Sequence, residues 1–139
     1  MKKIILFLLF PFLIKSQTSS ETEKSHIEKK MAYSDSSKKE AKQLIESYRQ
    51  QVINGEKNMS TMARLYSEDT GSAKDGGLIE NIGKGMMVLQ FEKVAFSLKV
   101  GEISEVFETQ YGFHFIELVT KKGELLHLRH ILIMPKKNN

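Results

Sequence analysis

The sequence predicts an α+β domain in which a small, largely antiparallel sheet is surrounded by three to four short helices. Two observations lead to this fold class. Apolar residues recur at steps of three and four in the first half of the chain, whereas the second half holds short apolar runs separated by Gly-containing turns. The length of 139 residues and the hydrophobic content of 40% suit one small domain with additional segments.

Residues 1–16 have the pattern of a secretory signal peptide. Two lysines precede an apolar run over residues 4–14, and a lysine and a serine follow it. This run is too short for a helix that crosses a bilayer, which takes about 20 residues. We expect an exported protein, most simply a periplasmic one, without a stable membrane span after cleavage. The alternative is a buried N-terminal helix or strand. Residues 17–34 are polar and predict a mobile tether.

Charge and composition exclude several classes of function. Without residues 1–16 the chain has 18 basic against 17 acidic residues, so the net charge falls from +4 to +1. The basic residues are not clustered as a nucleic-acid-binding face requires, so no nucleic-acid partner is expected. The chain has no cysteine, which excludes disulfides and thiolate nucleophiles.

Two helices are expected first. Ser37 and Glu40 have the spacing of a capping box at the start of a helix that ends near Asn54. Its inward stripe comprises Ala41, Leu44, Ile45, Tyr48 and Val52. A second helix is expected to begin at Asn58, with Met59, Met62, Ala63 and Tyr66 facing inward.

The remaining elements are shorter and are separated by glycines. We expect, in order, irregular backbone over 67–77, a strand over 78–82, a helix over 88–98, and strands over 103–109, 113–119 and 125–133. Residues 121–123 are expected to form the loop of a hairpin.

Residues 66–118 hold many specific residue types at fixed spacings. They comprise Tyr66 to Asp69, Gly71 to Ala73, Gly76-Gly77, Gly83-Lys84-Gly85, Met87, Phe91, Val100 to Ser104, and Thr109 to His114. This set closely resembles the parvulin (rotamase) domain of peptidyl-prolyl isomerases, especially the periplasmic SurA-like ones. On this basis residues 35–120 are interpreted as the parvulin-like domain, and residues 121–139 as a C-terminal strand and tail that completes the sheet.

The resemblance implies an activity and its site. The activity is cis/trans isomerisation of the bond before proline in unfolded or partly folded exported proteins, without a cofactor. The implied proline pocket comprises Ile79, Met87 and Phe91, with Tyr111 as a further substrate-binding residue. The implied catalytic network comprises Asp69, Thr109, His114 and a second histidine. The alternative function is a catalytically weak peptide-binding chaperone module.

The chain departs from the family pattern in three places. The usual Gly-Asp-Leu-Gly run is Gly77-Leu78-Ile79-Glu80, and Leu89 stands where a proline commonly precedes the pocket helix. The apolar first strand of a parvulin is matched poorly, because charged residues follow Ser25-His26-Ile27. The second histidine is therefore His26 or His130, which lies in the apolar run over 125–133.

A three-residue loop over 121–123 would place His114 directly opposite His130 on one face of a hairpin. We therefore expect the strand over 125–133 to substitute for the missing first strand. The alternative is a truncated remnant of a tandem parvulin protein. No metal site is expected, because His114 and His127 would point to opposite faces and no cysteine could complete a zinc site.

Overall fold

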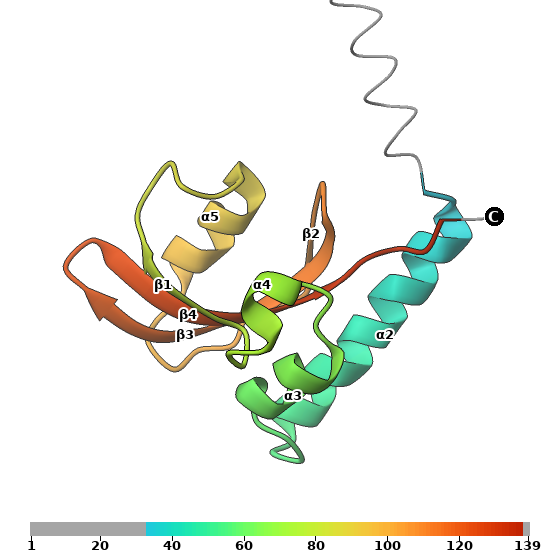
Figure 1. Ribbon diagram of the computed structural model, residues 1–139, viewed down its shortest axis with the longest axis horizontal. Helices are drawn as coiled ribbons and strands as arrows, with labels where there is room; N and C mark the ends of the chain where they lie inside the picture. Colours follow the sequence, from blue (N-terminus) through green and yellow to red (C-terminus); the bar gives the residue numbers. More distant parts are fainter. Residues whose placement is uncertain (1–32, 138–139) are drawn as a thin grey trace, which may run out of the picture. The chain divides into compact units, whose positions relative to one another are not determined.

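The computed structural model describes residues 33–137. The helices are α2 (Asp35–Ile53), α3 (Met59–Tyr66), α4 (Thr70–Ala73) and α5 (Leu89–Ser97); the strands are β1 (Leu78–Ile82), β2 (Phe107–Thr109), β3 (Gly112–Lys122) and β4 (Leu125–Ile133) (Figure 1). The strands form one antiparallel sheet in the order β1-β4-β3-β2, which confirms the α+β prediction. The predictions for residues 1–16, for His26 and for most of the tether lie outside the described residues.

Helix α2 begins earlier than the capping box predicted. Ser34 has extended backbone and its side chain accepts a hydrogen bond from the amide of Ser37, so Ser34 is the N-cap. Asp35 in the first turn favours this start because a negative charge there complements the helix dipole. Ser37 is instead a buried residue inside the helix.

The predicted inward stripes of α2 and α3 are largely correct. Buried apolar residues are Ala41, Ile45 and Val52 on α2 and Met59, Met62 and Ala63 on α3. Two expectations are wrong, because Leu44 and Tyr66 keep much of their surface in solvent. Tyr66 of α3 stacks on Tyr48 of α2 with ring centroids 4.5 Å apart. This partly exposed aromatic pair adds to the contact between the two helices.

The hairpin between β3 and β4 is tighter than predicted. Lys122 pairs with Leu125, so only Gly123 and Glu124 form the turn, with Gly123 at a φ of 60°. A register shift also interrupts the ladder between Leu118 and Thr120. Both features change which residues of the two strands face each other.

Strand β4 lies in the interior of the sheet, between β1 and β3 (Figure 1). By contrast, the strand expected over 103–109 is reduced to β2, with Ile103 forming an isolated bridge to Glu117. No helix in the described part of the chain combines the length and hydropathy that a membrane crossing requires.

The two faces of the sheet carry separate clusters of buried side chains. Phe113, Phe115, Ile131 and Ile133 contact α2 and α3 on one face. On the other face Ile116, Leu118, Leu126 and Leu128 contact Phe91 and Ala95 of α5. Successive side chains of β3 and β4 point to opposite faces of the sheet, so the two strands contribute to two separate cores. Figure 1 shows α2 and α3 on one side of the sheet and α5 on the other.

Candidate functional site

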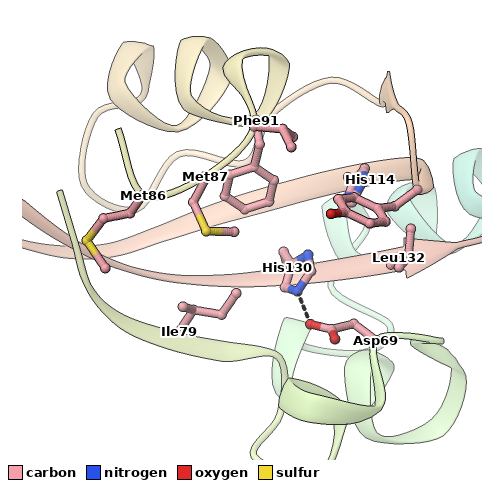
Figure 2. A pocket seen from close by; sticks show the side chains of 10 residues that line it. Asp69, Ile79, Met86, Met87, Phe91, His114, His130 and Leu132 are labelled. Atoms are coloured by element: carbon pink, nitrogen blue, oxygen red, sulfur yellow. Dashed lines mark hydrogen bonds and ion pairs between the residues drawn. The ribbon is translucent and has the colours of Figure 1, made fainter. Parts of the chain in front are cut away.

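A pocket of about 290 Å³ lies on the α5 side of the sheet. Figure 2 shows His114 and His130 on the strands, Phe91 and Met87 above them, and Asp69 and Ile79 along the lower rim. The complete lining comprises Asp69, Ile79, Met86, Met87, Val88, Phe91, Tyr111, His114, His130 and Leu132. An apolar hollow and a set of polar groups therefore share one pocket, which is the usual composition of a ligand site.

Asp69 is held by two hydrogen bonds on the α4 side of the pocket. The hydroxyl of Ser72 donates to Asp69 Oδ2 at 2.6 Å, one helical turn along the chain. His130 Nε2 lies 2.6 Å from the same oxygen and 3.1 Å from Ser72 Oγ (Figure 2). Asp69 and Ser72 precede His130 by about sixty residues. Their contacts with His130 therefore join distant parts of the chain.

The environment favours a charged Asp69 beside two neutral histidines. Partial burial raises the pKa of Asp69, but hydrogen bonds from Ser72 and His130 outweigh burial, and the pKa lies below its ordinary value. Burial lowers the pKa of His114 to about 4, with His130 acting in the same direction and Asp69 opposing it. Burial also lowers the pKa of His130, although Asp69 opposes that shift. At neutral pH the Nε2–H of His130 therefore donates to the carboxylate.

His114 is fixed by a threonine and by aromatic rings. Its Nε2 lies 2.6 Å from the hydroxyl oxygen of Thr109, which also accepts a hydrogen bond from the amide of Tyr111. The ring of Phe107 stacks on His114 with centroids 5.3 Å apart, and His114 in turn stacks on His130 at 5.7 Å. Phe91 meets both imidazoles edge-on at 5.7 and 5.5 Å. The imidazoles thus have defined orientations within the core.

The backbone of the turn after α4 is in direct contact with the backbone of β4. Gly77 has a φ of 76°, its carbonyl accepts a hydrogen bond from the amide of His130 at 3.0 Å, and a Cβ at Gly77 would lie 2.4 Å from the His130 carbonyl oxygen. Only glycine fits this position. The guanidinium of Arg129 also donates to the carbonyls of Asp75 and Gly76 at 3.1 and 2.9 Å. These contacts hold the α4 turn, and with it Asp69, against His130.

The predicted direct opposition of the two histidines is wrong. His130 pairs with Ile116, and His114 pairs with Leu132, because the hairpin turn has two residues and the ladder contains a register shift. His114 and Ile116 are two residues apart on β3, so the two histidines still share a face as diagonal neighbours. The expected histidine pair is present with a different register.

The structure brings the residues singled out in the sequence to one place. Among the described residues all of them line the pocket except Thr109, whose hydroxyl contacts His114. The sequence analysis missed Ser72, Met86, Val88, Phe107 and Leu132. Ser72 lies in the segment Gly71 to Ala73, which is part of the family resemblance but to which no function was assigned. Met86 directly precedes Met87, so its position next to a predicted pocket residue was the signal that could have identified it. Phe107 and Leu132 both pair with His114 across the sheet, so only the correct register identifies them.

His127 lies apart from this pocket. Its Nδ1 is 3.4 Å from Glu80 Oε1. His127 lies on β4 three residues before His130, and an odd separation along a strand places the two side chains on opposite faces of the sheet. Within residues 33–137 no group of three or more His, Cys, Asp or Glu side chains could hold a metal ion.

Comparisons with known proteins agree on one family. A family model described as a rotamase, the PPIC-type PPIase domain, matches residues 13–120. The match ends before β4, so His130 lies outside it.

Several curated proteins are similar to this chain. Foldase protein PrsA 4 of Bacillus cereus is 34% identical over 124 residues, which are 87% of this chain and 42% of that protein. Foldase protein PrsA of Geobacillus kaustophilus is 45% identical over 65 residues, or 47% of this chain and 23% of that protein. Chaperone SurA of Alcanivorax borkumensis is 41% identical over 68 residues, or 49% of this chain and 16% of that protein.

A solved structure is also similar. The crystal structure of the peptidylprolyl isomerase PrsA from Bacillus cereus has 30% sequence identity and a TM-score of 0.41, covering 73% of this chain and 31% of that one. The chain spans less than half the length of each of these relatives.

Proposed function

The chain belongs to the PPIC-type peptidyl-prolyl isomerase (parvulin) family, and we propose that it catalyses cis/trans isomerisation of bonds before proline in exported proteins that are unfolded or partly folded. The observation that carries this proposal is the pocket in which Met87 and Phe91 face the Asp69–His130 pair. The foldase and chaperone names of the relatives support client proteins as substrates. The signal-like residues 1–16 support a periplasmic location.

The reaction needs a grip on the proline ring and a lower barrier to rotation. Resonance gives the C–N bond partial double-bond character and a barrier of about 18–20 kcal/mol. The apolar side chains of Ile79, Met87 and Phe91 suit the ring of proline, with Tyr111 at the rim. A ring held there leaves the preceding carbonyl free to rotate, and any interaction that is stronger in the twisted state accelerates the rotation.

Asp69 has the charge to act on that carbonyl. Resonance in the planar amide places partial negative charge on the carbonyl oxygen, and this charge decreases as the bond twists. A carboxylate near the oxygen disfavours the planar form more than the twisted form, which lowers the barrier. Ser72 and His130 keep Asp69 ionised and oriented, so we assign Asp69 the direct electrostatic role. His114 and Thr109 orient His130 through the stacked imidazoles.

The test is an isomerase assay by NMR exchange on the purified full chain with a short proline peptide. Met87→Ala should lower kcat/KM by about tenfold because it removes apolar contact with the ring. Asp69→Asn, which keeps the shape but removes the charge, should also lower it by at least about tenfold. Val100→Ala is the control, since Val100 is exposed and does not line the pocket. Equal rates in folded Met87→Ala, Asp69→Asn and wild-type protein would refute the assigned site.

Substitution combined with the isomerase assay also decides whether His130 or His26 is the second histidine of the site. We propose His130, because its ring stacks on His114 and contacts Asp69. His130→Ala should therefore lower both the melting temperature and the isomerase rate, whereas the matched variant His26→Ala should change neither. Unchanged melting and activity in His130→Ala would exclude β4 as the substitute for the first strand.

A second candidate function is peptide binding without useful catalysis. Met86 and Tyr111 line the pocket while keeping more than half of their surface in solvent, and exposed apolar groups at a pocket favour binding of unfolded chains. A pure holdase suppresses aggregation of a client but leaves its slow proline-limited refolding phase unchanged. Refolding of such a client, followed with and without the protein, separates the two functions.

A further inference from the structure

Met86 lies at one end of the pocket, and binding of a proline ring by Met87 and Phe91 does not explain its position there. Met86 is 64% exposed and nevertheless lines the pocket. Its thioether sulfur accepts a hydrogen bond from the amide of Gly83 at 3.1 Å, and its own amide donates to the Gly83 carbonyl at 3.4 Å. The side chain is therefore folded back over the turn between β1 and α5, with most of its surface still exposed.

Leu125 continues this apolar surface beside Gly83. A Cβ at Gly83 would lie 3.4 Å from Leu125 Cδ2 and 3.6 Å from Met86 Sδ, so the two side chains approach the same side of this glycine. Leu125, at the start of β4, is also 39% exposed. An exposed apolar surface that adjoins a pocket is typical of a binding surface, and methionine adapts its shape to different partners.

The direction of a bound peptide follows from the proposed function, on which this inference rests. The rotating carbonyl, which precedes proline, is assigned to Asp69, and the proline ring to Met87 and Phe91. In Figure 2 Met86 lies on the far side of Met87 from Asp69. Because the carbonyl that precedes proline is placed at Asp69, the residue that leaves the proline pocket on the opposite side, toward Met86, is the one that follows proline. Its Cα lies about 3.8 Å from the proline Cα.

We propose that Met86, with Leu125 beside it, forms an apolar subsite for the side chain of the residue that follows proline. The site then selects prolines followed by Leu, Met or Phe over those followed by Ala or Ser. Such pairs are buried in folded proteins and accessible in unfolded ones, because large apolar side chains are usually inside a folded protein. The subsite thus provides a physical basis for recognising unfolded segments.

The experiment measures kcat/KM by NMR exchange, without a coupling protease, because proteases themselves select the residue after proline. The full chain is tested on two peptide series, one varying the residue after proline (Ala, Ser, Leu, Phe) and one varying the residue before it. Wild-type protein should prefer Phe over Ala after proline by about tenfold, as expected for a large apolar group that enters an apolar subsite. Met86→Ala should remove most of this preference, lowering kcat/KM for the Pro-Phe peptide much more than for the Pro-Ala peptide, and Leu125→Ala should reduce the preference less.

Leu89→Ala is the matched control, because Leu89 is 62% exposed and close in sequence but does not line the pocket. It should leave the preference unchanged. A Met86→Ala variant that is slower on every peptide alike, or a preference that depends only on the residue before proline, would overturn the subsite.

Absence of catalysis with every peptide would instead refute the proposed function. In that case the same peptides are titrated by NMR chemical shift. The subsite then requires that Met86→Ala weakens binding of the Pro-Phe peptide much more than binding of the Pro-Ala peptide. An equal effect on both peptides, or no effect on either, would overturn it.

Discussion

The two faces of strands β3 and β4 use the same backbone for different purposes. Phe113, Phe115 and Ile131 point toward α2 and α3 and form a core of apolar side chains. His114 and His130, which alternate with them, point toward α5 and the pocket. The residues on both faces are buried, but the α5 side also carries the buried imidazoles of His114 and His130, held by Thr109 and Asp69.

This difference shows how a small domain can hold a polar site without loss of its core. Buried polar groups are costly unless they are hydrogen-bonded. Here each imidazole has one hydrogen-bonded Nε2, whereas the Nδ1 atoms of His114 and His130 have no partner among the described residues. Both faces therefore contribute apolar packing, and the pocket face in addition carries buried imidazoles that favour function over stability.

The largest effect is expected on stability, from a substitution on the face of the sheet that packs against α2 and α3. Phe115→Ala should lower the free energy of unfolding by about 3–5 kcal/mol, because Phe115 is fully buried and its removal leaves a cavity. Urea denaturation measures this change. The molecules that remain folded should keep their kcat/KM, since Phe115 does not line the pocket. A loss of activity in fully folded Phe115→Ala protein would show that the faces are coupled.

Acid should destabilise the pocket face next. Well above pH 6.5 His114 is neutral in both the folded and the unfolded chain, so its pKa does not affect stability there. As the pH falls from 6.5 toward about 4, the unfolded chain binds a proton that the folded chain does not, and stability decreases. The full loss is on the order of 3 kcal/mol, reached near pH 4. His130, whose pKa is also lowered by burial, acts in the same direction.

Denaturation across this pH range measures the effect. The control is His114→Gln, whose amide retains a hydrogen-bonding group near Thr109 but does not titrate. The slope between pH 6.5 and 4 should be smaller in this variant. An identical slope in the variant and in wild-type protein would mean that His114 is not the titrating group.

The smallest expected effect concerns the support of Asp69. Ser72→Ala removes one hydrogen bond to the carboxylate and should cost about 1 kcal/mol of stability. It should also raise the pKa of Asp69, since the hydroxyl of Ser72 favours the charged form. NMR titration of the Asp69 carboxyl group measures the shift. Ser47→Ala, which removes only an exposed hydrogen bond within α2, should leave this titration unchanged.

Much of the architecture was predictable because it depends on local patterns. The helical stripe with Ala41 and Ile45 and the strand over 125–133 follow from periodicity and residue types. The pocket residues Met87 and Phe91 are those that the resemblance to the parvulin family implies. The errors occur at boundaries. Ser34 caps α2 in place of Ser37, and β2 is shorter than predicted, because capping and pairing depend on contacts beyond the local pattern.

The sequence by itself determined the class of fold and the presence of two histidines on one hairpin, and the resemblance to the family supplied part of the pocket lining, such as Met87 and Phe91. Only the tertiary structure decided how they meet. A two-residue turn at Gly123 and a register shift after Leu118 place His130 opposite Ile116, and the approach of Gly77 to β4 places Asp69 and Ser72 beside it. Register and close backbone approach depend on the balance of contacts across the whole sheet, and local periodicity does not record them.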